Sequence, residues 1–187
     1  DGKPLIEYTI NFLLNSSKID KIVVSTDNEE IANISKKIGA EVPFLRPVEL
    51  AEDQTPDLPV IEHYLQFLEE NNLELPDLIL YARPTSPIRD QDELNEAIEL
   101  ISNNTESTAL RSVVDTGKYH SYWMYKEDQG YLKPFDEENS VKKYPRRQLL
   151  PKLFMLSGNI DIIRTSLIKK GELYGNKILK FENKNKI

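Results

Sequence analysis

Short apolar runs alternate with amphipathic segments over the first 114 residues, and this alternation constrains the fold more than any other feature. Four runs have the length and β-branched content of strands: KIVV (21–24), EVPF (41–44), DLILY (77–81) and TALRSVV (108–114). The apolar spacing around them predicts helices over 4–16, 27–39, 56–72 and 90–103. Strands that alternate with helices favour a parallel sheet covered on both faces, so we predict an α/β fold.

Polar residues mark the ends of two of these predicted helices. Asp27 and Glu30 have the spacing of a capping box, and Gly39 can close the same helix. Asp90 and Glu93 form a second capping box. An N-cap role explains Asp27 without any ligand, and contact with a ligand is the alternative interpretation.

The alternation stops after residue 114. The segment 121–135 reads as a hairpin that turns at 128–130, and 141–152 (VKKYPRRQLLPK) is irregular and basic. Strand character returns in NIDII (159–163) and KILKF (177–181). We predict an excursion from the sheet between about 119 and 156, within a single domain that spans 1–187.

The composition excludes several classes of site. The chain has no cysteine, which rules out disulfides, thiolate zinc sites and cysteine nucleophiles. Its formal net charge of -7 argues against a general nucleic-acid binder, and no apolar run approaches the roughly 20 residues that span a bilayer. With no segment like a signal peptide, a cytoplasmic location is the default.

Three polar loops follow predicted strands, at the sheet edge where α/β folds bind ligands: 25–27, 45–57 and 82–90. In the last of these, Pro84 and Pro87 keep the backbone extended, so the loop can hold hydroxyls and arginines in place. The alternative is a plain connector with solvated arginines. Five cations in 142–152 predict either an anion site or a solvated basic loop: Lys142, Lys143, Arg146, Arg147 and Lys152.

Four motifs occur in a fixed order: STD (25–27), RPVELAED (46–53), ARPTSPIRD (82–90) and RRQLLPK (146–152). Together with GKPLIEYTI near the start, they closely resemble the acylneuraminate cytidylyltransferase family, which comprises the CMP-sialic acid synthetases and their relatives. The resemblance implies a Rossmann-like three-layer sandwich with a mostly parallel sheet and a protruding dimerisation arm. It also implies a homodimer that uses Mg2+ to transfer CMP from CTP to an acidic sugar, with release of pyrophosphate.

The resemblance implies residue roles where the motifs match. Arg46, Asp53 and Asp57 are expected at the nucleotide. The substrate-binding residues are expected to be Asp27, Arg83, Thr85, Ser86, Arg147 and Gln148, the last two from the dimerisation arm. We assign no catalytic residue and no metal ligand, because the family's phosphate loop would precede Asp1 and its acidic metal motif would follow Ile187. The chain is therefore expected to be inactive alone.

Two departures concern the sugar site. Arg83 stands where sialic acid enzymes usually have glutamine, and Met155 and Ser157 replace an arginine and an asparagine. We hypothesise that Arg83 supplies an anion contact that Met155 cannot make, so that the substrate is a different nonulosonic acid or a sugar phosphate. If so, replacing Arg83 with glutamine must reduce turnover.

We therefore predict a cytidylyltransferase that activates a nonulosonic acid as its CMP-sugar for surface glycan assembly. CTP and the acidic sugar are its expected partners, with no nucleic acid and no membrane. One alternative keeps the fold and transfers the nucleotide to a sugar 1-phosphate. The other is a catalytically inactive module for sugar-nucleotide binding or dimerisation.

Overall fold

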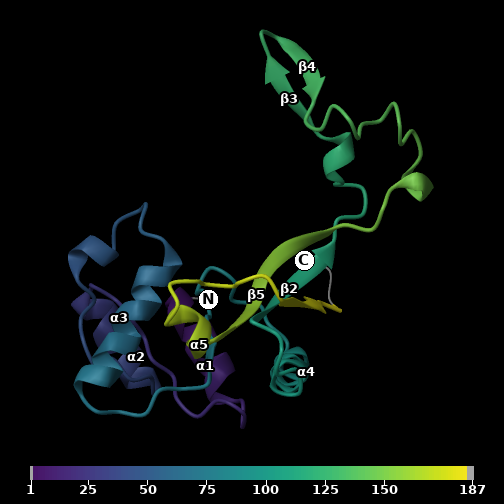
Figure 1. Cartoon of the computed structure of the whole chain (residues 1–187). Coiled ribbons are helices and arrows are strands. Elements are labelled where there is room, and N and C mark those ends of the chain that lie inside the picture. Colours follow the sequence, from purple (N-terminus) through teal and green to yellow (C-terminus); the bar gives the residue numbers. More distant parts are fainter. Residues whose placement is uncertain (1, 185–187) are drawn as a thin grey trace.

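The computed structural model describes residues 2–184, and its centre is a four-stranded mixed sheet in the order β1-β5-β2-β6 (Figure 1). The strands are β1 (Leu78–Leu80), β2 (Ala109–Asp115), β5 (Phe154–Arg164) and β6 (Ile178–Glu182). β5 runs antiparallel to both of its neighbours, whereas β2 and β6 pair in parallel.

The prediction of a mostly parallel sheet holds in part: β1, β2 and β6 run in the same direction, and β5 alone runs against them, which makes the sheet mixed. No crossover helix separates β2 from β5, because the chain leaves the sheet after β2, forms the protruding segment and returns directly as β5. A parallel pair needs a crossover, so β5 enters in the opposite direction. The two predicted strands at 21–24 and 41–44 reduce to one parallel bridge, between Val23 and Glu41.

The four predicted helices are present, as α1 (Leu5–Leu14), α2 (Glu29–Ile38), α3 (Asp57–Glu70) and α4 (Gln91–Ser102). A short helix that was not predicted, α5 (Thr165–Ile168), follows β5. Asp90 caps α4, as expected, by accepting hydrogen bonds from the backbone of Asp92 and Glu93. The cap of α2 is Asn28 rather than Asp27: its Oδ1 accepts from the backbone N of Ile31 at 3.0 Å. Asp27 therefore keeps its carboxylate for another contact.

Helices cover both faces of the sheet, as predicted. Neighbouring strand residues point to opposite faces, so each face carries apolar side chains that pack against helices. Ile162 packs with Leu94 and Ile101 of α4 and Leu13 of α1, whereas Ile163 packs in a separate cluster with α3 and α5. Figure 1 shows α3 and α4 on different sides of the β2–β5 pair. No helix within 2–184 is long and apolar enough to cross a membrane.

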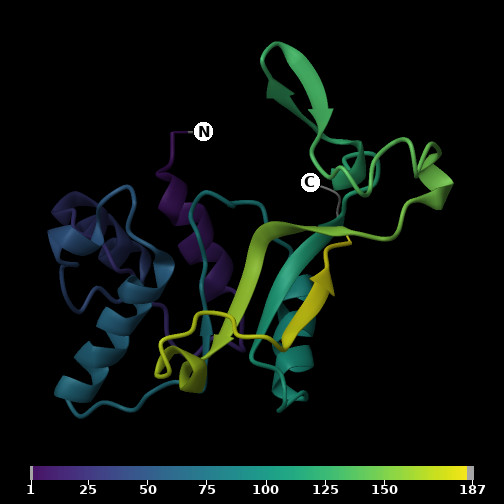
Figure 2. The ribbon, with the colours of Figure 1, turned by 45° about the horizontal axis from the view of Figure 1, so that its top comes forward.

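The segment between β2 and β5 stands off the sheet in both views (Figures 1 and 2). It carries the hairpin of β3 (Tyr125–Asp128) and β4 (Tyr131–Pro134), whose turn has positive φ at Gln129 and Gly130. Two successive left-handed residues give the tight turn that the sequence predicted at 128–130. Short 3-10 helices flank the hairpin at Ser121–Trp123 and Arg147–Leu149, and a third, Val48–Leu50, lies in the loop before α3. The excursion is therefore present, and its role as a dimerisation arm stays a prediction.

Candidate functional site

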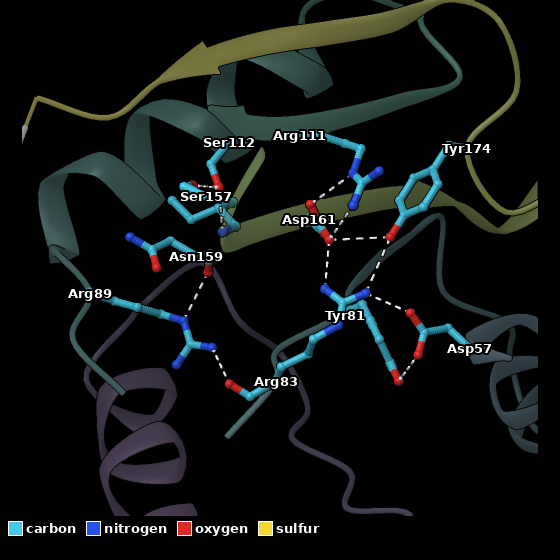
Figure 3. A network of polar contacts seen from close by, with 11 residues as sticks. Asp57, Tyr81, Arg83, Arg89, Arg111, Ser112, Ser157, Asn159, Asp161 and Tyr174 are labelled. Carbon is cyan, nitrogen blue, oxygen red and sulfur yellow. Dashed lines mark hydrogen bonds and ion pairs between the residues drawn. The ribbon is translucent and has the colours of Figure 1, made fainter. Parts of the chain in front are cut away.

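The loop 82–90 leaves the carboxyl end of β1, and Arg89 holds its backbone in place (Figure 3). The Arg89 guanidinium donates to the carbonyl oxygens of Arg83 at 2.6 Å and Asn159 at 2.8 Å, and to Thr9 Oγ1 at 3.1 Å. Burial, and then the charge of Arg83, lower the pKa of Arg89 to about 10, which still leaves the group charged at neutral pH. Arg89 thus fixes the loop against β5 and α1.

The side chain of Arg83 does not point into open solvent. Its Nη1 donates to Asp161 Oδ2 at 2.7 Å and its Nη2 to Asp57 Oδ2 at 2.6 Å. The guanidinium also lies 4.6 Å from the centre of the Tyr81 ring, whose hydroxyl donates to Asp57 Oδ1 at 2.9 Å. Both oxygens of Asp57 are thereby occupied.

Asp161 is the centre of this cluster, with a side chain only 1% exposed. Besides Arg83, it accepts from Arg111 Nε at 3.2 Å and from the Tyr174 hydroxyl at 3.2 Å. Arg111 in turn lies 3.9 Å from the centre of the Tyr174 ring. We call these six residues the Arg83 network: Asp57, Tyr81, Arg83, Arg111, Asp161 and Tyr174 (Figure 3).

The network is electrostatically balanced, because its two arginines face two carboxylates. Burial lowers the pKa of Arg83, but the hydrogen bonds to Asp161, Tyr174 and Asp57 outweigh that effect, so the pKa lies above its ordinary value. Sequence reasoning missed Asp161 and Arg111. The signal was there: Asp161 is the one charged residue in the apolar run NIDII, and a buried carboxylate requires a partner.

The central strand β5 bulges beside the loop 82–90. The register between β2 and β5 shifts at Ser112, whose Oγ accepts from the backbone N of Ile160 at 2.8 Å and lies 2.7 Å from Ser157 Oγ. In the bulge, Gly158 has φ +72°, and a Cβ atom built there would lie 3.6 Å from Ser86 Oγ. The bulge therefore brings Gly158, the residue after Ser157, close to Ser86 of the predicted sugar loop.

The other two predicted loops also meet. The backbone N of Arg46 donates to Thr26 O at 2.8 Å, and its Nη2 lies 3.9 Å from Asp27 Oδ1. Arg46 Nε and Ser25 Oγ are buried without a hydrogen-bond partner anywhere in residues 2–184. Buried donors without partners are rare in folded proteins, so these two atoms mark a place where a polar ligand is expected.

The remaining predicted residues lie in three parts of the structure. Asp53 is exposed, Asp57 begins α3, and Thr85 and Ser86 lie in the loop 82–90, exposed and half-buried respectively. Arg147 and Gln148 are exposed and belong to the 3-10 helix Arg147–Leu149 of the protruding segment, which stands off the sheet in both views (Figures 1 and 2). One chain by itself therefore does not bring them to the sugar loop.

Magnesium does not fit the residues that the structure describes. Within 2–184 there is no group of three or more histidine, aspartate or glutamate side chains that could hold a metal ion. Asp57 and Asp161, the carboxylates beside the loop 82–90, are engaged by arginines. The phosphate loop and the acidic motif implied by the resemblance lie outside the described residues.

Known proteins share both the sequence and the fold. A 139-residue stretch is 30% identical to a pseudaminic acid cytidylyltransferase of Campylobacter jejuni, covering 74% of this chain and 59% of that protein. A 148-residue stretch is 31% identical to an N-acylneuraminate cytidylyltransferase of Escherichia coli, covering 79% of this chain and 33% of that protein. A CMP-N,N'-diacetyllegionaminic acid synthase of Legionella pneumophila is 37% identical over 99 residues, which cover 53% of this chain and 42% of that protein. The matched stretch thus spans about three fifths of the pseudaminic relative.

Solved structures agree on the fold. The structure of CMP:2-keto-3-deoxy-manno-octonic acid synthetase complexed with CTP superposes with a TM-score of 0.67 at 12% identity, covering 97% of this chain and 80% of that one. A 4-diphosphocytidyl-2C-methyl-D-erythritol synthase gives 0.63 at 12% identity, covering 98% and 81%. These likenesses support the Rossmann-like α/β architecture. The sequence model described as "Cytidylyltransferase" matches residues 1–170, and the chain therefore belongs to the cytidylyltransferase family.

Proposed function

We propose that this chain forms the main part of an enzyme that transfers CMP from CTP to a nonulosonic acid. The observation that carries the proposal is the family match over residues 1–170, joined to relatives whose names specify pseudaminic, legionaminic and N-acylneuraminic acids. All three sugars are acidic nonulosonic acids, so the shared chemistry is the activation of such a sugar as a CMP derivative.

The nucleotide is proposed to bind where the turn 25–27 meets the loop 45–57. Arg46 Nε and Ser25 Oγ are buried donors without protein partners among the described residues, and a ligand with phosphate or hydroxyl oxygens would satisfy them. Asp27 pairs only loosely with Arg46, at 3.9 Å, and 42% of its side chain is exposed. Its carboxylate is therefore available to a ligand hydroxyl. Asp53 is proposed beside the same ligand.

The sugar is proposed to bind against the loop 82–90, through Thr85 and Ser86. Both hydroxyls lie on a backbone that two prolines and Arg89 keep rigid, so little conformational entropy is lost on binding. The ion pair of Arg83 with Asp57 places this loop next to the start of α3, which follows the nucleotide loop directly. The two substrates would thus lie side by side.

In the proposed reaction, a sugar hydroxyl oxygen attacks the α-phosphorus of CTP. A new phosphorus–oxygen bond joins CMP to the sugar, the bond to the β-phosphate oxygen breaks, and pyrophosphate leaves. Nucleotidyl transfer of this kind needs positioning and charge stabilisation rather than a covalent nucleophile. We also propose a homodimer in which Arg147 and Gln148 reach the partner's sugar site, because the protruding segment that carries them stands off the sheet of its own chain (Figure 2).

Pyrophosphate release by the full-length protein tests the proposal. The four nucleoside triphosphates would be combined with pseudaminic, legionaminic and N-acetylneuraminic acids and with a sugar 1-phosphate. We expect release only with CTP and an acidic nonulosonic acid, and loss of release when a chelator removes magnesium. Release with a sugar 1-phosphate would favour the alternative substrate, and no release from any pair would favour the inactive module.

A further inference from the structure

We propose that Arg83 is a positioning residue that couples CTP binding to sugar binding, rather than a direct contact of the sugar anion. The inference rests on the proposed function and deepens it. Arg83 stands at the beginning of the loop 82–90, and its guanidinium reaches Asp57, which begins α3 immediately after the predicted nucleotide loop. One side chain therefore joins the two proposed substrate loops.

The contacts of Arg83 leave little room for a substrate anion. Its two terminal nitrogens are each committed to a carboxylate, at 2.7 Å for Asp161 and 2.6 Å for Asp57. A sugar carboxylate would have to displace one of them. Displacing Asp161 would leave a carboxylate that is only 1% exposed with one arginine fewer, and removing the partner of a buried charge is strongly unfavourable.

The opposite end of the network is rigid. Asp161 lies on the central strand β5 and also accepts from Arg111 and Tyr174, so it fixes one side of the Arg83 guanidinium to the sheet. The backbone of Arg83 is fixed as well, because its carbonyl oxygen accepts from Arg89 at 2.6 Å. The contact with Asp57 is thus the one that can change when the loop 45–56 changes.

This geometry gives the coupling a direction. A nucleotide that orders the loop 45–56 also fixes Asp57, which keeps Arg83 and the start of the sugar loop in place. The cost of holding the Arg83 side chain in this position, on a backbone that is already rigid, is then met before the sugar arrives. We expect CTP to tighten sugar binding about tenfold, within the usual range of coupling between two sites, and the sugar to tighten CTP binding by the same factor.

Calorimetry on the full-length protein can measure this factor. The dissociation constant of pseudaminic acid would be determined without nucleotide and with a saturating CTP analogue whose α,β-bridge cannot be cleaved. Asp57→Asn removes the charge that attracts Arg83 but keeps an oxygen for the Tyr81 hydroxyl. Arg83→Lys keeps the charge but offers one ammonium nitrogen in place of the two guanidinium nitrogens that hold Asp161 and Asp57.

Arg164→Gln is the matched control. Arg164 is another partly buried arginine with several hydrogen bonds, to the carbonyl oxygens of Ser107, Ile101 and Asn104, and it touches neither substrate loop. It controls for a general loss of stability. The coupling factor is the dissociation constant of the sugar without nucleotide divided by its value at saturating nucleotide. A direct effect of Asp57→Asn on CTP affinity therefore does not enter it.

We expect the factor to fall from about ten towards one in Asp57→Asn and Arg83→Lys and to stay unchanged in Arg164→Gln. An unchanged factor in Asp57→Asn overturns the inference. So does tighter sugar binding by Asp57→Asn without nucleotide, since an arginine released from Asp57 would then serve the sugar anion directly. If the unmodified protein releases no pyrophosphate from CTP and binds no CTP analogue, the proposed function fails, and this inference fails with it. If the unmodified protein turns over CTP but Asp57→Asn leaves the coupling factor unchanged, only the inference fails.

Discussion

Replacing Asp161 with asparagine removes the charge at the centre of the Arg83 network while almost preserving the shape of the side chain. Asp161 accepts hydrogen bonds from Arg83, Arg111 and Tyr174 and is 1% exposed. A hydrogen bond to a charged group contributes about 1.5–3 kcal/mol, and breaking a buried ion pair costs about 3–5 kcal/mol. The two arginines keep 27% and 19% of their side-chain surface exposed, so water offsets part of the loss.

We therefore expect Asp161→Asn to lower the free energy of unfolding by about 3 kcal/mol, near the lower end of the range for buried pairs. For a chain of this length that corresponds to a drop in Tm of roughly 6–12 °C. Urea titration followed by circular dichroism measures the change, with an unchanged m-value showing that the transition is the same. Asp128→Asn, which breaks an exposed ion pair with Lys133, is the control and should cost less than about 1 kcal/mol. A loss in Asp161→Asn no larger than in this control would refute the reasoning.

Three further outcomes follow from the contacts around the same sheet. Burial, and then the hydrogen bond to Asp57, raise the pKa of Tyr81 to about 12. The fold thus favours the neutral phenol, and this stabilisation is present below about pH 10 and lost as the pH rises towards 12. In Asp57→Asn the pKa of Tyr81 should fall. Ultraviolet titration checks this, with Tyr81→Phe in the same background as the reference, and an unchanged midpoint would contradict the hydrogen bond between Tyr81 and Asp57. Gly158→Ala should cost about 1–2 kcal/mol by thermal unfolding, from the positive φ alone, because the new Cβ meets nothing closer than 3.6 Å. Glu93→Gln weakens the 2.6 Å hydrogen bond that the buried Glu93 carboxylate accepts from Asn183, just after β6. Amide hydrogen exchange in β6 should therefore become faster, and unchanged protection there would show that this hydrogen bond does not stabilise the strand.

Local features of the sequence were sufficient to predict the four longer helices, α1 to α4. Their apolar spacing, the cap at Asp90 and the closing Gly39 act within a few residues of the chain, and the structure has all three. Two errors occurred at this level: the short helix α5 was missed, and Asp27 was predicted as a cap in place of its neighbour Asn28, although both residue types cap helices well. The turn at 128–130 was predictable for the same local reason.

The direction of β5 and the partners of Arg83 were not predictable in the same way. NIDII has the same composition whichever way the strand runs, and its direction follows from the path of the chain through the protruding segment. Asp57 and Asp161, the partners of Arg83, lie 26 and 78 residues away from it in the sequence. No local pattern encodes contacts over such separations. The sequence thus located the loop 82–90 but not the direction of its first arginine.

Phosphorus-31 NMR of a single reaction tests the central claim most directly. The full-length protein would be mixed with CTP, magnesium and pseudaminic acid, and the fate of the α-phosphorus followed. The account predicts that the CTP signals give way to pyrophosphate and one phosphodiester resonance, from CMP joined to the sugar. CTP signals that persist in the presence of the sugar, or that yield free CMP without a phosphodiester, would contradict it.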